Sequence, residues 1–238
     1  MRIRGKMTLG GLALAAAGAL ACPAAACRLA LALALDVSAS VDAAEYRLQA
    51  EGTAAALLSP PVQAAILAEP GGIALAAYVW SGERAHDRVA DWVVIDGAEA
   101  LERFAARIAA HPRSGLFDGR TAIGAAILAG ARLFAAGPPC AARTLDIATD
   151  GENNAGPHPA DVKGRMDFTI NALSIGGDLP FDHELLDLAS GPLTAYLMRN
   201  VIHGPGAFVE QAEDYRDVER AMTRKLLREL QGMALSLR

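Results

Sequence analysis

The residues with the clearest chemical potential are an aspartate and two serines at alternate positions, Asp36, Ser38 and Ser40. They follow an unbroken apolar run over residues 29–35, which is typical of a strand buried on both faces of a parallel sheet. A turn after such a strand can direct the three oxygen-bearing side chains toward one point. Hard cations such as Mg²⁺ bind one or two carboxylates, neutral oxygens and retained waters. The spacing therefore predicts a divalent-cation site.

Two later segments supply oxygen donors of the same kind. Thr121 follows a glycine-containing loop and begins a predicted helix, while Asp150 follows a predicted strand over residues 143–148 and precedes Gly151. In open α/β sheets, ligands bind at the carboxyl ends of strands, where the strand order reverses. Each residue alone could be a helix cap or part of a tight turn. Together they provide two carboxylates and three hydroxyls, a hard-cation set: Asp36, Ser38, Ser40, Thr121 and Asp150.

Four further polar residues are expected on the rim of this site: Asp118, Glu152, Asn153 and Asn154. Asp118, Asn153 and Asn154 could bind water molecules around a cation or shape the turns that carry them. Glu152 could contribute a hydrogen bond behind the site or face solvent.

The hydrophobic pattern predicts strands that alternate with helices. Strands are expected over residues 29–35, 73–80, 89–95, 143–148, 168–175 and 207–209. Helices are expected over residues 42–58, 62–67, 98–110, 121–136, 161–166, 181–188, 194–200 and 214–235. The short turn at residues 81–84 leaves no room for a crossover helix, so the strands beside it form an antiparallel hairpin. The pattern favours an α/β fold with a doubly wound, mainly parallel six-stranded sheet and one antiparallel edge strand.

The first 26 residues resemble a secretory signal peptide. Arg2, Arg4 and Lys6 form a basic start, residues 9–21 are apolar, and residues 24–26 are small alanines that suit cleavage. The apolar run is too short to span a bilayer comfortably. We therefore expect a single domain over residues 27–238, exported to the periplasm or secreted, with no membrane span in the mature chain. Cleavage before Cys22, a lipid anchor there and an uncleaved anchor are the alternatives.

Two cysteines outside this segment suggest a disulfide. Cys27 lies nine residues before Asp36, and Cys140 lies ten residues before Asp150. If the strands ending at these aspartates are parallel neighbours, both cysteines fall at the same edge of the sheet, where a disulfide is geometrically reasonable. An oxidising compartment would favour it. Two separate free thiols are the alternative.

The charge of the chain restricts the classes of partner. Its 238 residues carry a formal net charge of -5 at pH 7. Without residues 1–26 the chain keeps 19 basic and 27 acidic side chains. A moderately acidic protein with no basic run is a poor candidate for binding nucleic acid or anionic lipid.

The five predicted ligands resemble the metal-ion-dependent adhesion site of von Willebrand factor type A domains. That motif is Asp-x-Ser-x-Ser, then a distant Thr, then an Asp usually followed by Gly; the likeness extends over residues 28–233. Four stretches are also similar to an exported bacterial family of this fold that is known as a domain of unknown function. They are Leu-Asp-Val-Ser-Ala-Ser-Val-Asp (35–42), Thr-Ala-Ile-Gly (121–124), Asp-Gly-Glu-Asn-Asn (150–154) and Asn-Val-Ile-His-Gly-Pro-Gly-Ala-Phe-Val (200–209).

The resemblance implies a binding function and no enzymatic activity. In such domains the serines and the threonine surround a divalent cation, the aspartates often act through water, and one coordination position stays open. An acidic side chain of a protein or peptide partner fills that position. The expected cation is Mg²⁺, with Mn²⁺ or Ca²⁺ as alternatives.

Two other classes of function remain open. A metal-dependent phosphohydrolase also has an aspartate after its first strand, but it needs a second aspartate two residues later for acid–base work. Ser38 occupies that position here. The other class is a structural interaction domain that holds no metal.

Overall fold

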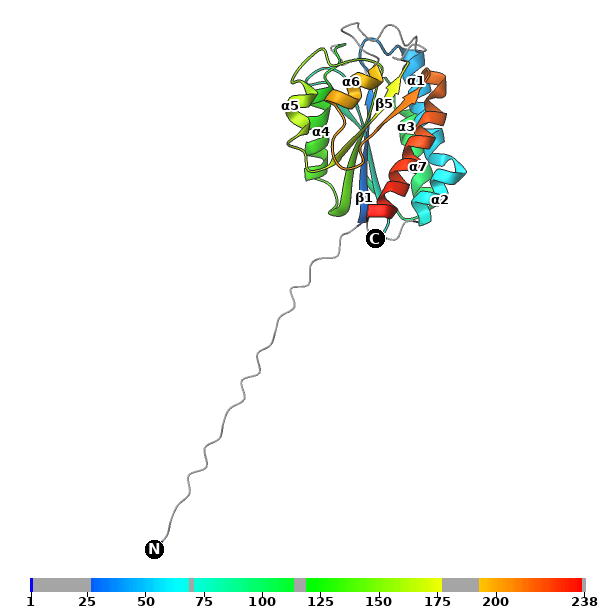
Figure 1. The fold of residues 1–238 in the computed structure, drawn as a ribbon. Helices are drawn as coiled ribbons and strands as arrows, with labels where there is room; N and C mark the ends of the chain where they lie inside the picture. Colours follow the sequence, from blue (N-terminus) through cyan, green and yellow to red (C-terminus); the bar gives the residue numbers. More distant parts are fainter. Residues whose placement is uncertain (2–26, 69–70, 114–118, 177–192, 237–238) are drawn as a thin grey trace.

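A computed structural model describes Met1 and residues 27–68, 71–113, 119–176 and 193–236 (Figure 1). The described chain contains a six-stranded sheet with the strand order β3-β2-β1-β4-β5-β6. Its strands are β1 (Cys27–Asp36), β2 (Ile73–Trp80), β3 (His86–Ile95), β4 (Cys140–Thr149), β5 (Thr169–Ile175) and β6 (Val209–Ala212). Its helices are α1 (Ala43–Leu58), α2 (Pro60–Ala68), α3 (Ala98–Ala110), α4 (Ile123–Ala135), α5 (Pro159–Lys163), α6 (Leu193–Asn200), the 3₁₀ turn η1 (Tyr215–Asp217) and α7 (Val218–Ser236).

The sheet has the predicted topology. β1 is parallel to β2 on one side and to β4 on the other, and β4, β5 and β6 continue in parallel. β2 and the edge strand β3 form the expected antiparallel pair. The chain moves outward from β1 in one direction and then returns to add β4 on the other side. The strand order therefore reverses between β1 and β4, which is where ligands bind in sheets of this class.

Helices cover both faces of the sheet (Figure 1). The alternation of side chains along a strand explains the two cores. In β1 the leucines pack with α1, α2, α3 and α7, whereas Ala30, Ala32 and Ala34 face the core under α4, α5 and α6. Small residues also bring α4 close to the sheet: a Cβ at Gly130 would lie 2.8 Å from a methyl group of Leu145.

Several element boundaries differ from the sequence prediction. α4 begins at Ile123, so Thr121 lies before the helix. α5 begins at Pro159 because the His158 side chain caps it and proline suits the first turn. The last strand covers residues 209–212, and a 3₁₀ turn precedes α7. The helix predicted over residues 181–188 and the segment 2–26 lie outside the described residues.

The predicted disulfide is confirmed. Cys27 pairs in register with Cys140 at the amino edge of β1 and β4, and a disulfide joins the two residues, whose Cα atoms are 4.4 Å apart. Within the described segments, no helix is both long enough and apolar enough to cross a membrane.

Candidate metal centre

Three segments from different parts of the chain meet at the carboxyl edge of the sheet. The first follows β1, the second precedes α4 and the third follows β4. The amide of Ala39 donates to the carbonyl of Gly119 at 3.0 Å, which joins the first segment to the second. The amide of Asn154 donates to the carbonyl of Thr121 at 2.9 Å, which joins the third to the second. The backbone therefore fixes the positions of the predicted ligands.

Hydrogen bonds link four of the predicted ligands, one of them through a backbone amide. The Ser38 backbone amide donates to Asp36 Oδ1 at 2.7 Å, and the hydroxyls of Ser38 and Ser40 lie 3.1 Å apart. Ser40 Oγ donates to Asp150 Oδ1 at 2.8 Å. Residues 110 positions apart in the sequence thus share one cluster of oxygens, as predicted from the ends of β1 and β4.

Thr121 lies beside this cluster. Its side chain is buried, and its Oγ1 is 3.9 Å from the point where a Cβ on Gly151 would stand. Asn154 Oδ1 accepts a hydrogen bond from the Thr121 amide at 2.9 Å. A Cβ at Gly151 would make an ordinary van der Waals contact with Thr121 Oγ1, so the loop after Asp150 lies directly beside the threonine. The structure therefore brings all five predicted residues to one end of the sheet.

Asp36 is the buried base of the cluster. Both of its carboxylate oxygens accept hydrogen bonds, Oδ1 from the Ser38 amide and Oδ2 from Thr149 Oγ1 at 2.6 Å. Burial disfavours the charged form and raises the pKa of Asp36 to about 7. The two hydrogen bonds oppose this effect, and the negative charge of Asp150 adds to it. A bound cation would offset both the desolvation of the buried carboxylate and its repulsion by the second carboxylate.

The residues fit a hard divalent cation. Neither Asp36 nor Asp150 forms an ion pair with any lysine, arginine or histidine in the described part of the chain. The described residues also contain no group of three or more His, Cys, Asp or Glu side chains arranged to hold a metal. A cation here would therefore rely on hydroxyl oxygens beside the two carboxylates. Such all-oxygen sets suit Mg²⁺, Mn²⁺ or Ca²⁺ better than soft metals.

Two of the four rim residues, Asn153 and Asn154, connect the loop after β4 to the start of α4 by hydrogen bonds. Asn153 Oδ1 accepts from the amide of Gly124 at 3.2 Å, and Asn154 holds the Thr121 amide. Both asparagines thus hold the start of α4 against the loop after β4. This matches the alternative in which they shape the turns around the site. Glu152 is exposed, and Asp118 lies outside the described residues.

Sequence reasoning missed three residues that support the site. Thr149 bonds the carboxylate of Asp36, and Gln49 Nε2 donates to the Asp36 carbonyl at 2.9 Å from the buried face of α1. Arg113 donates to the carbonyls of Val37 and Ser38 at 3.4 and 3.2 Å. A polar Gln49 among the apolar residues that face the core from α1 was the available signal. Thr149 and Arg113 carried no signal that separates them from ordinary strand and loop residues.

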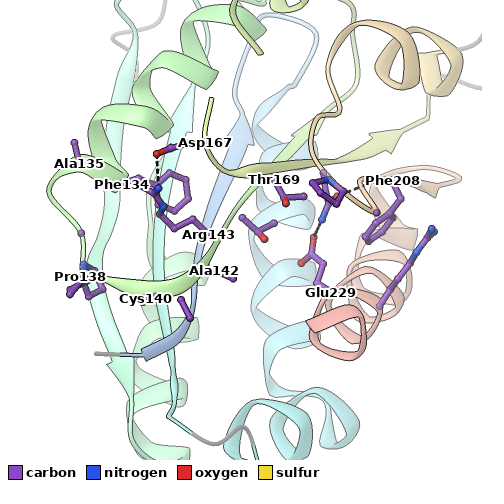
Figure 2. A pocket seen from close by; sticks show the side chains of 18 residues that line it. Phe134, Ala135, Pro138, Cys140, Ala142, Arg143, Asp167, Thr169, Phe208 and Glu229 are labelled. Atoms are coloured by element: carbon purple, nitrogen blue, oxygen red, sulfur yellow. Dashed lines mark hydrogen bonds and ion pairs between the residues drawn. The ribbon is translucent and has the colours of Figure 1, made fainter. Parts of the chain in front are cut away.

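One hollow in the described part of the chain lies elsewhere in the molecule. It has a volume of about 1040 Å³ and opens at the amino ends of β4 and β5, away from the candidate metal centre. Figure 2 shows Arg143 and Asp167 on one side of it and Phe208 and Glu229 on the other. Of the residues predicted for the metal site, its rim and the disulfide, Cys140 alone is among those that line this hollow. This hollow is therefore separate from the metal centre.

Solved structures of low sequence identity share the fold. Proximal thread matrix protein 1 from the mussel byssus matches with a TM-score of 0.60 and 17% identity over 86% of this chain and 46% of its own. A second structure of that protein has a zinc-occupied MIDAS motif (TM-score 0.61, 15% identity, 87% and 48%). A von Willebrand factor type A protein from Catenulispora acidiphila matches with a TM-score of 0.54 and 18% identity over 84% and 42%.

A pilus adhesin, SpaC from Lactobacillus rhamnosus GG, also matches (TM-score 0.57, 12% identity, 87% of this chain and 31% of its own). The chain thus spans less than half the length of these four matched structures. The fold is that of a von Willebrand factor type A domain. A comparison with curated proteins found no match.

The sequence also matches a family model directly. The model is described as "Protein of unknown function (DUF1194)" and covers residues 26–234. This stretch contains all the described helices and strands except the last residues of α7. The chain belongs to the DUF1194 family, whose fold here is a von Willebrand factor type A domain.

Proposed function

We propose that this chain is an exported interaction domain that binds an acidic side chain of a protein or peptide partner through a divalent cation, with Mg²⁺ as the preferred ion. The proposed ligands are Asp36, Ser38, Ser40, Thr121 and Asp150. The observation that carries the proposal is the bonded path from the buried Asp36 through Ser38 and Ser40 to Asp150. It gathers oxygen donors from distant segments where no basic side chain of the described chain neutralises them.

The chain's own residues would decide how the site recognises a carboxylate. When bound, the cation supplies a positive centre that attracts an anionic ligand. Ser38, Ser40 and Thr121 contribute neutral oxygens, so the set neutralises a divalent charge less than an all-carboxylate set would. Asp36 is fixed by Thr149 and the Ser38 amide, which pre-orients it. An acidic protein could thus bind an acidic partner at this point.

The fold relatives support a binding role at the level of their class. They include a matrix protein and a pilus adhesin, and the matrix protein has a structure with zinc in the corresponding motif. Ser38 also stands where a phosphohydrolase of similar topology would need a second aspartate. We therefore propose binding without catalysis.

Export is part of the proposal. The disulfide between Cys27 and Cys140 suits an oxidising compartment, and the sequence before Cys27 has the pattern of a signal peptide. These two features together support a periplasmic or secreted location.

The carboxylate preference can be tested with acetate as the probe. The product purified after expression of the full chain is titrated with Mn²⁺ by calorimetry, first in acetate and then in acetamide at the same concentration and ionic strength. By linkage, a carboxylate that completes the coordination sphere must raise cation affinity. We expect tighter Mn²⁺ binding in acetate alone, after correction for the weak binding of Mn²⁺ by acetate itself. Equal affinity in the two solutions would contradict a carboxylate-binding site.

A further inference from the structure

A tyrosine that the sequence did not single out lies at the same edge of the sheet as the metal centre. β6 is parallel to β5 and ends at Ala212, and Tyr215 follows three residues later in η1. Asp214 caps this turn by accepting hydrogen bonds from the amides of Arg216 and Asp217. The capped turn fixes the backbone of Tyr215 between the end of β6 and the start of α7.

The Tyr215 hydroxyl is buried without a hydrogen-bond partner among the described residues. The side chain belongs to the core under α1 and α7 and is 9% exposed. Its oxygen is inaccessible to solvent and forms no hydrogen bond of normal geometry with the described residues. An unsatisfied buried hydroxyl destabilises the folded state, and native structures satisfy nearly all such groups. We therefore expect a hydrogen-bond acceptor for this hydroxyl, and the described residues offer none in normal geometry.

The group that this hydroxyl approaches is the carboxylate of Asp150. Burial is the main cause that raises the pKa of Tyr215 above its usual value; the negative charge of Asp150 and a side-chain contact with it come next, followed by the charges of Asp36 and Glu45. The phenol hydroxyl is therefore a hydrogen-bond donor beside a group of carboxylates. Asp150 Oδ1 already accepts from Ser40, whereas Oδ2 accepts no hydrogen bond from the described residues.

We propose that Tyr215 is a positioning residue of the metal centre, whose hydroxyl donates a hydrogen bond to Asp150 Oδ2 when a cation is bound. This inference rests on the proposed function. Ser40 on one oxygen and Tyr215 on the other would fix the plane of the carboxylate. Partners that orient a metal-binding carboxylate typically contribute 10- to 100-fold to metal affinity.

The test is Tyr215→Phe, which keeps the ring in the core and removes the hydroxyl. Mn²⁺ and Mg²⁺ affinities are measured by calorimetry, and the melting temperature is measured with chelator. We expect about tenfold weaker cation binding and no loss of stability in chelator, because an unpaired buried hydroxyl has been removed. A merely structural tyrosine would give the opposite pattern, with lower stability in chelator.

Tyr46→Phe is the matched control. Tyr46 lies in the same core, and its hydroxyl bonds His111 Nδ1 at 2.9 Å, away from Asp150. This variant should keep wild-type cation affinity. Wild-type affinity in Tyr215→Phe, or a drop that Tyr46→Phe reproduces, would overturn the role of Tyr215 while the metal site stands. No cation binding by the wild-type chain would overturn the proposed function and this inference together.

Discussion

At the scale of single residues, Asp36 carries the largest electrostatic cost of the site. It is fully buried, and two hydrogen bonds do not offset the loss of hydration, so its pKa rises to about 7. A structural carboxylate would normally be paired with a basic side chain or exposed to water. The desolvation cost of Asp36 is explained if its carboxylate binds a cation.

Asp36→Asn should separate the metal site from the fold. Asparagine has nearly the same shape but no charge, so we expect at least a 100-fold loss of cation affinity with a metal-free domain at least as stable as the wild type. Calorimetry and thermal unfolding in chelator measure the two effects. Asp42→Asn is the control, because asparagine also caps helices well and Asp42 caps α1 outside the cluster. A stable Asp36→Asn variant that binds Mg²⁺ normally would refute the assignment.

The raised pKa of Asp36 also predicts opposite pH dependences with and without cation. Its folded-state pKa is about 7 and its unfolded value about 3.8, so the folded chain binds the extra proton between these values. Without cation, the contribution of Asp36 to the free energy of unfolding is largest below pH 4 and falls as pH rises through 7.

Cation binding needs the ionised form of Asp36. Mn²⁺ affinity should therefore rise with pH, up to about tenfold per unit below pH 7, and level off above it. Calorimetric titrations across about pH 5 to 8 measure the slope. Affinity that is independent of pH over this range would mean that Asp36 is not a ligand.

Sequence reasoning proposed the five ligand residues, which the structure brings to one end of the sheet, but it did not identify most of the residues that hold them in place. The ligands could be predicted because each stands at the end of a recognisable strand or loop. Thr149, Arg113 and Tyr215 act through contacts between segments far apart in the chain, and such contacts depend on the packed structure. Tyr215 looks like an ordinary core residue until its unpaired hydroxyl is seen beside Asp150.

At the scale of elements, the position of α4 determines where Thr121 lies. A Cβ on Gly124 would be 2.0 Å from the carbonyl oxygen of Pro157. Because this neighbour is a backbone atom, the clash could be removed only by moving the backbone. Gly124→Ala should push the start of α4 away from the loop after β4, lower the free energy of unfolding by about 1–3 kcal/mol and weaken cation binding.

Gly164→Ala provides the matched control for Gly124→Ala. Gly164 has a helical backbone, and a Cβ there would meet nothing within 4 Å. Thermal unfolding and Mn²⁺ calorimetry should show little change. Equal effects of the two substitutions would refute the steric explanation.

The disulfide lies at the opposite edge from the site and should affect stability alone. It joins residues 113 positions apart, so the chain-entropy model predicts that Cys27→Ser with Cys140→Ser lowers the free energy of unfolding by about 4–5 kcal/mol. Urea unfolding measures this loss. Cation affinity of the folded variant should equal that of the wild type. A large loss of affinity would show that the disulfide is coupled to the metal centre, and it would contradict this prediction.

Strands were easier to predict than helix starts. Continuous apolar runs identified β1, β2 and β5 to within two residues at each end. The start of α4 was placed two residues early, because Thr121 has the residue type of a cap while the observed cap position is Ala122. In the structure Thr121 instead holds the loop after β4 through Asn154.

At the scale of the whole molecule, an acidic chain of net charge -5 is proposed to bind an acidic partner. Long-range electrostatics oppose such an encounter, so the attraction must come from one local positive centre. The low identity to solved structures, 18% or less for the four matches described, establishes the fold and leaves the partner to experiment.

A titration with Mg²⁺, Mn²⁺ and Ca²⁺ that follows thermal stability would decide whether the metal site exists, with Asp150→Ala as the paired variant. A ligand that binds the folded state alone raises its stability by about 2.7 kcal/mol at 100 times the dissociation constant. We expect a saturable rise for the wild type with at least one of these cations and none for Asp150→Ala. A flat wild-type response to all three cations, or an equal rise in the variant, would contradict the metal site.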